Sequence, residues 1–176
     1  MARGFAVAVA LLCAGAPAEA QTASPEARLR AEAFMRDMLA LEGSGERLKE
    51  LLGRAPSEVF YRSVDYDSSE EPGWDEIAVA SAPTLGETSC KPLSATETAC
   101  AVTVALGSGF VFSREDYWPA TLESQQYEVR VRPEGCKIVS RLPRPFLTPA
   151  GAVGFLGQPP YDQPRLLALK QQLERR

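Results

Sequence analysis

Apolar positions in the first part of the chain recur at the spacing of one helix face. After Ser24 and Pro25, which can serve as the N-cap and the first helical residue, the steps alternate between four and three residues. The positions that share this face are Ala27, Ala31, Phe34, Met38 and Leu41. The repeat predicts an amphipathic helix that ends at Gly43-Ser44-Gly45.

A second, shorter apolar face follows directly. The segment Glu46–Leu52 places Leu48, Leu51 and Leu52 inward and predicts a short helix, and Pro56 can start another turn that reaches Phe60. From Ser63 to Gly73 the chain is acidic and polar, which predicts a loop.

Beyond this loop the apolar period changes from that of a helix to that of a strand. Alternation of apolar and polar residues predicts strands, and Pro133-Glu134-Gly135 predicts a tight turn between the last two. The predicted strands are Glu76–Ala80, Thr88–Leu93, Cys100–Leu106, Tyr127–Arg132 and Cys136–Leu142. The segment Gly107–Leu122 lacks clear alternation and is predicted to be a loop.

The last thirty or so residues suggest helices and connectors. Thr148-Pro149 can cap a short helix that runs to Leu156, and prolines at positions 159, 160 and 164 mark a connector. Leu166, Leu169 and Leu173 share one face of a final helix. Residues 146–176 are therefore expected to form a C-terminal helical extension or tail, which either packs on the domain or docks on a partner.

The first 20 residues have the features of a cleavable signal peptide. Arg3 supplies the positive start, the run from Phe5 to Ala14 is apolar, and Ala18-Glu19-Ala20 offers small residues for cleavage. The apolar run is shorter than the roughly 20 residues of a membrane span. Leu12 before Cys13 disfavours a lipid-modified cysteine. We therefore expect a mature chain from Gln21, periplasmic or secreted, whose residues 21–145 form one domain.

The charge and the cysteine content bear on possible partners and on disulfide bonding. Removal of Arg3 and Glu19 with the leader leaves the net charge at −4, and the chain has no basic cluster for nucleic acid. Three cysteines remain after the leader. In an exported protein, three cysteines can form one disulfide and leave one free thiol. We expect the bridge between Cys90 and Cys100, because this pair flanks a short segment that can join two strands. Cys136 would then be free.

The absence of histidine excludes the most common catalytic chemistries. A Ser-His-Asp or Cys-His nucleophile, a histidine base and His-ligated zinc are impossible within this chain. Nucleotide-binding glycine motifs are also missing, and no cofactor is predicted. The acidic loop places Asp65, Asp67, Ser69, Glu71 and Glu76 at the calcium-ligand positions of an EF-hand, but Glu70 stands where glycine is needed, so no metal site is predicted.

Two residue sets remain as site candidates. Acid–base chemistry by carboxylate and tyrosine could use Asp37, Tyr61, Asp65 and Tyr66, although nothing in the sequence shows that they converge. Aromatic residues between positions 107 and 122 either bind a ligand or fill the open end of the sheet as part of the core. The core role is favoured, because large aromatic rings are usually buried. These candidate ligand-binding residues are Phe110, Phe112, Tyr117 and Trp118.

The order of these elements resembles the nuclear-transport-factor-two-like superfamily, the cystatin-like α+β roll. The resemblance lies in AEAFMRDMLALEGSGERLKELL, in TACAVTVALG and in QQYEVRVRPEGCKIVSRL. It implies an α+β fold in which N-terminal helices pack on a curved antiparallel sheet and leave a conical pocket. Some members are isomerases or dehydratases, while others are binding or assembly modules, so the fold alone selects no function.

The sequence thus predicts a soluble exported domain, most simply a non-catalytic binding or assembly module of the cell envelope. Its partner would be an envelope protein or a small apolar ligand, and membrane insertion after leader cleavage is not expected. The alternative is a small enzyme or carrier that uses Asp and Tyr on an apolar ligand. A third hypothesis is a subunit that docks through its last helix.

Overall fold

The computed structural model describes residues 24–54, 59–65 and 74–175. Its helices, in chain order, are α1 (Pro25–Ser44), α2 (Glu46–Leu51), the 3-10 turn η1 (Tyr61–Ser63), α3 (Pro149–Val153) and α4 (Pro164–Glu174). Its strands are β1 (Ile77–Ala80), β2 (Thr84–Pro92), β3 (Thr98–Ala105), β4 (Gly107–Phe112), β5 (Tyr117–Leu122), β6 (Gln125–Arg132), β7 (Gly135–Ile138) and β8 (Phe146–Leu147).

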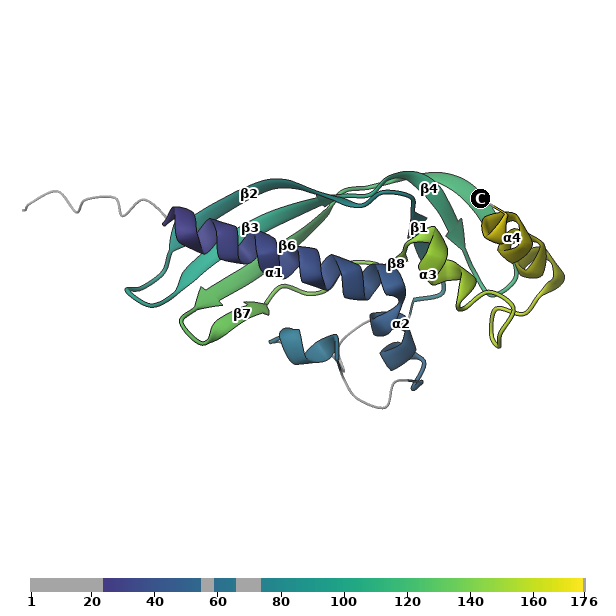
Figure 1. Cartoon of the computed structure of the whole chain (residues 1–176), viewed down its shortest axis with the longest axis horizontal. Coiled ribbons are helices and arrows are strands. Elements are labelled where there is room, and N and C mark those ends of the chain that lie inside the picture. The colour runs from purple at the N-terminus through teal and green to yellow at the C-terminus, as the bar shows by residue number, and fades with distance from the viewer. Residues whose placement is uncertain (1–23, 55–58, 66–73, 176) are drawn as a thin grey trace, which may run out of the picture.

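The strands form two four-stranded sheets that meet at a bend. One sheet has the order β2-β3-β6-β7 and the other β5-β4-β1-β8, and all pairs are antiparallel except β1 with β8. The pairing register continues across the bend, because Ala80 pairs with Gly109 and Thr84 pairs with Ala105, a step of four residues on each strand. The result is one curved surface with α1 lying along one half and α3 and α4 against the other (Figure 1). The predicted α+β fold with N-terminal helices on a curved antiparallel sheet is confirmed.

Helix α1 packs on the sheet that contains β2, β3 and β6. Ser24 caps it by accepting a hydrogen bond from the Glu26 N–H at 3.2 Å, as predicted. The buried face is rotated slightly from the predicted one: Met35 and Leu39 are buried, whereas Phe34 and Leu41 are only half-buried. Each fully buried side chain of this size contributes roughly 1.5–3 kcal/mol, so α1 and this sheet stabilise each other.

The turn between α1 and α2 depends on Gly45. Its φ of 89° is in the left-handed region, and its N–H donates to the Glu42 carbonyl at 2.9 Å. A side chain here would also collide with Phe155, since a Cβ would lie 2.2 Å from its Cε2. The predicted end of the first helix is therefore confirmed at a position that only glycine fits.

The C-terminal helices pack on the other half of the sheet and share its core. Leu166 and Leu169 of α4 are buried with Ile77, Val79 and Phe112 in a second apolar cluster. Strand β8 lies parallel to β1 in the same half. The hypothesis of docking through an exposed apolar face of the last helix therefore loses its support, because Leu166 and Leu169 are buried in the chain's own second cluster and α4 packs on α3.

The segment predicted to be a loop, Gly107–Leu122, forms strands β4 and β5. Phe110 and Phe112 pair across to Pro119 and Tyr117, so an alternation of faces is present. Glycine and proline obscured it, because they carry no clear apolar signal. Gly107, with a φ of 70°, lies at the bend between β3 and β4. In the described ranges, no helix has the length and apolar character needed to cross a bilayer.

Candidate functional site

A groove of about 620 Å³ opens beside the bend, on the sheet face opposite to α3 and α4. Its floor is made of the buried residues Ala78, Leu106 and Val111. One wall is the chain from Ala120 to Gln126, which passes from β5 into β6. Pro143 and Arg144 also line the groove, and this segment meets the first wall at Gln125. The groove is thus a large hollow with an apolar floor and a polar rim, which is the usual character of a ligand site.

Both tryptophans of the chain line this groove. Trp118 lies on β5 and is 38% exposed, an unusual state for so large an apolar side chain. Trp74 lies just before β1 and is half-buried. Because tryptophan combines a large apolar surface with one N–H donor, the exposed Trp118 is well suited to hold an amphipathic ligand, and Trp74 adds apolar surface beside it.

The four aromatic candidates do not lie together. Only Trp118 lines the large groove. Phe110 and Tyr117 lie on the other face of the sheet, with ring centroids 6.2 Å apart, where they and α4 line a smaller hollow of about 330 Å³. Phe112 is fully buried against Tyr161, with ring centroids 5.2 Å apart. One of the four is therefore in the groove, two are at the second hollow and one is in the core.

Buried polar side chains hold the wall segment Pro143–Phe146 in place. They reach its backbone from α1, α2 and β6, three elements that are distant in the sequence. The hydrogen bonds run from Arg47 Nη2 to the Pro143 oxygen (2.9 Å), from Gln125 Nε2 to the Arg144 oxygen (2.7 Å) and from the Phe146 N–H to Glu42 Oε1 (3.3 Å). The groove wall is therefore fixed by the core rather than left as a loose loop.

The ion pair between Glu42 and Arg47 is the centre of this arrangement. Arg47 Nη1 donates to Glu42 Oε1 at 2.8 Å, and the side chains are 3% exposed for Glu42 and 1% for Arg47. The guanidinium also lies 5.8 Å from the centroid of the Phe60 ring. Two charges so far from water are tolerated because each satisfies the other and both bond to backbone groups.

Tyr127 is bonded to the groove wall and lies close enough to this ion pair to be influenced by both charges. Its hydroxyl donates to Gln125 Oε1 at 2.8 Å. Burial raises the pKa of Tyr127 well above its ordinary value, the negative charge of Glu42 raises it further, and Arg47 partly opposes the rise. The phenol is therefore neutral at physiological pH and acts as a hydrogen-bond donor.

Sequence reasoning did not find these buried polar residues. Glu42 lies four residues after Met38, on the buried face of α1, and a carboxylate on an apolar stripe was the available signal. Arg47 and Gln125 gave no such signal, since both stand in segments with other polar residues.

The residues considered for acid–base catalysis do not converge. Asp37 is exposed on α1, and Asp65 is exposed and lies 3.5 Å from Arg132. Tyr61 packs edge-on against Phe60 with centroids 5.5 Å apart. Tyr66 lies outside the described residues. The enzyme hypothesis required an Asp and a Tyr facing each other in a pocket, and the described members of this set are not so placed.

The acidic loop can be followed only at its two ends. Asp67, Ser69, Glu70 and Glu71 lie outside the described residues, while Glu76 lies 3.4 Å from Arg144. Within the described ranges, no group of three or more acidic or cysteine side chains is arranged to hold a metal ion.

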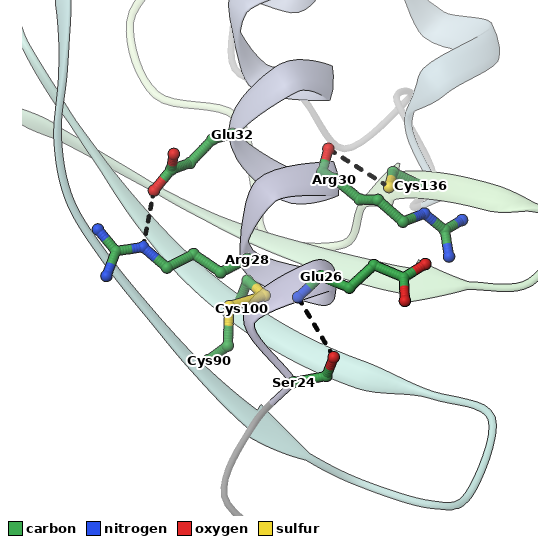
Figure 2. The surroundings of a disulfide bond; sticks show 8 residues. All are labelled: Ser24, Glu26, Arg28, Arg30, Glu32, Cys90, Cys100 and Cys136. Carbon is green, nitrogen blue, oxygen red and sulfur yellow. Dashed lines mark hydrogen bonds and ion pairs between the residues drawn. A yellow bond between two sulfur atoms is a disulfide. The ribbon is translucent and has the colours of Figure 1, made fainter.

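The disulfide is at the predicted place. Cys90 and Cys100 are directly opposite each other on β2 and β3 and are bonded, with Cα atoms 4.0 Å apart. Figure 2 shows the bridge beside the first turns of α1. Cys136 is a half-buried free thiol on β7, 4.0 Å from the Arg30 carbonyl oxygen. Burial raises the pKa of Cys136, and the nearby Arg30 partly lowers it, so the thiol is poorly reactive.

No family model, curated protein or solved structure matches the chain. The resemblance to the nuclear-transport-factor-two-like superfamily therefore stays a prediction about layout.

Proposed function

We propose that this protein is an exported, non-catalytic binding module of the cell envelope, and that the groove lined by Trp74 and Trp118 is its binding site. The groove is the observation that carries the proposal. It combines an apolar floor, two tryptophans and a rim of amide, hydroxyl and charged groups, as ligand sites commonly do.

Export is supported by two features of different kinds. The leader-like residues 1–20 predict translocation, and a disulfide between Cys90 and Cys100 persists in oxidising compartments but rarely in the cytosol. We therefore place the mature chain in the periplasm or outside the cell.

Binding is favoured over catalysis by the chemistry around the groove. Its ionisable side chains are Glu123, Arg144 and the neighbouring Glu76, and the last two form an ion pair. Among the described lining residues, Glu123 is thus the one carboxylate outside this ion pair, and no tyrosine lies beside it in the lining to form an acid–base pair. The alternative, a carrier of an apolar ligand, uses the same groove and differs only in what fills it.

A neutral fluorescent probe, N-phenyl-1-naphthylamine, tests whether the groove accepts apolar ligands. We expect its emission to rise with the mature protein and to fall several-fold with Trp118→Ala. The matched control is Leu167→Ala, which removes another exposed apolar side chain, on α4. Equal emission with all three proteins would contradict the groove as a binding site.

The export claim has a separate test. Intact-mass analysis of the protein from the producing cell, without reduction, should give a chain that starts at Gln21 and has lost two hydrogens to one disulfide. A chain that retains Met1 and three reduced cysteines after residue 20 would place the protein in the cytosol and overturn this part of the proposal.

A further inference from the structure

One wall of the groove is a continuous segment of chain, which bears on the shape of its ligand. Seven consecutive residues, Ala120 to Gln126, line one wall. At the rise of an extended strand these residues span at most about 20 Å, because the segment crosses the bend between β5 and β6 at Glu123 and Ser124. A wall of this extent can accompany up to about six residues of an extended chain, more than a single small ion or ring would contact.

The sheet edge along this wall has no strand beside it in the described part of the chain. Strand β7 pairs with Val129–Arg132 of β6, and the residues after it, Val139 and Ser140, bond as far as Glu128, which is before the groove. At the other end, the edge is closed to a new strand, because the Tyr117 N–H donates to Asp116 Oδ1 at 2.6 Å and Pro119 has no N–H. Both features prevent a further strand from pairing with this end of β5. A ligand is therefore held mainly by side chains in the groove and not by a full strand ladder along β5.

The charge of the rim selects the sign of the ligand. Glu123 is exposed and makes no ion pair with another described residue, whereas Glu76 and Arg144 lie 3.4 Å apart and largely offset each other. One uncompensated negative charge therefore remains beside two tryptophans. Indole rings attract cations through their π faces, most often the guanidinium of arginine.

We propose that the ligand of the groove is an extended peptide segment in which arginine or lysine alternates with apolar residues. This inference rests on the proposed binding function and names its ligand class. The apolar side chains enter the groove over Leu106 and Val111, while the cations reach Glu123 and the tryptophan faces. Such a segment is complementary to the groove in length, in charge and in polarity.

The two tryptophans make the test direct, because they are the only ones in the chain and both line the groove. The mature protein is titrated with a capped hexapeptide of alternating leucine and arginine, and intrinsic tryptophan emission is recorded. We expect saturable binding that weakens as salt is added. The same peptide with glutamate in place of arginine should bind at least about tenfold more weakly, a difference of about 1.4 kcal/mol.

Glu123→Gln should weaken binding of the arginine peptide about two- to fivefold, the size expected of an exposed ion pair. Glu134→Gln changes the net charge equally but lies at the turn between β6 and β7, and it should leave binding unchanged. Equal affinity for the two peptides, or an unaffected Glu123→Gln variant, would overturn the inference. Equally tight binding of ethylguanidinium would also overturn it, since a small cation would then suffice. If neither peptide binds while N-phenyl-1-naphthylamine still does, the ligand class is wrong and the binding function stands.

Discussion

Arg47 donates a hydrogen bond to Glu42 across 2.8 Å in a place where both side chains are almost completely removed from water. Glu42 lies in the last turn of α1 and Arg47 in the first turn of α2, and each also bonds to the segment Pro143–Phe146 that lines the groove. A surface salt bridge would contribute little, but here the loss of one partner leaves an uncompensated charge in the core.

We expect Arg47→Met to destabilise the protein by about 3–5 kcal/mol, because Glu42 remains buried without its cation. The double variant Glu42→Met with Arg47→Met should recover much of this loss, since apolar side chains of similar volume often replace a buried ion pair at small cost. Urea unfolding of the three proteins measures both effects. A double variant no more stable than Arg47→Met would show that the ion pair is not the source of the loss.

Tyr127 should make stability fall in alkaline solution. Its pKa in the folded protein is raised by burial and by Glu42. The unfolded chain ionises this phenol near its ordinary pKa of about 10. The advantage of the folded state is therefore complete below about pH 10 and is lost as the pH rises toward the folded pKa.

Tyr127→Phe checks this expectation. At neutral pH it should cost about 1–3 kcal/mol, because Gln125 Oε1 loses its buried donor. Between about pH 8 and pH 11, unfolding should depend less steeply on pH than in the unsubstituted protein. Burial also raises the pKa of Tyr161, so the stability of both proteins should still fall somewhat as the pH rises. Identical pH profiles would mean that Tyr127 ionises as readily in the folded state as in the unfolded one.

The disulfide should contribute about 2–3 kcal/mol, as expected for a bridge whose cysteines are 10 residues apart. Replacement of Cys90 and Cys100 by alanine, or addition of a reductant, should lower the urea midpoint to a similar extent. Cys136→Ala is the control and should change stability by less than about 1 kcal/mol, since its thiol is only half-buried. A midpoint that does not respond to reductant would argue against the bridge in solution.

Gly45 and Gly53 form a natural pair for testing the turn after α1. Both have a positive φ, 89° and 65°, but a Cβ at Gly45 would meet Phe155 whereas one at Gly53 would meet nothing within 4 Å. We expect Gly53→Ala to cost about 1–2 kcal/mol for the backbone alone. Gly45→Ala should cost about 1–3 kcal/mol more, because the side chain overpacks the core. Equal losses would show that the contact with Phe155 is easily relieved.

Local signals in the sequence predicted the parts of the fold whose contacts are local. The cap at Ser24, the stop at Gly45 and the β6–β7 hairpin each depend on residues close in the chain, and all are confirmed. The Cys90–Cys100 bridge belongs to this group, because a short hairpin brings the two residues opposite each other.

The rest required contacts between distant segments. Strands β4 and β5 were missed because Gly107, Gly109 and Pro119 obscure the alternation that their pairing reveals. Of the residues that line the groove, the sequence singled out only Trp118 as a ligand candidate. The rest could not be found, because Pro143 and Arg144 come from a distant segment that only the fold brings to this place. Glu42, Arg47 and Gln125 hold the groove segment Pro143–Phe146 by hydrogen bonds to backbone groups that are about 20 to 100 residues away in the sequence, so no local pattern indicates them.

The most direct test of the groove as a binding site is photo-crosslinking in the producing cell. A benzophenone amino acid is placed at Thr121, which is exposed in the groove wall, or at Glu134, which is exposed at the distant β6–β7 turn. We predict a discrete adduct from position 121 that disappears when Trp118→Ala is added, and none from position 134. The same adducts from both positions, or an adduct at 121 that survives the loss of Trp118, would contradict the groove as the binding site.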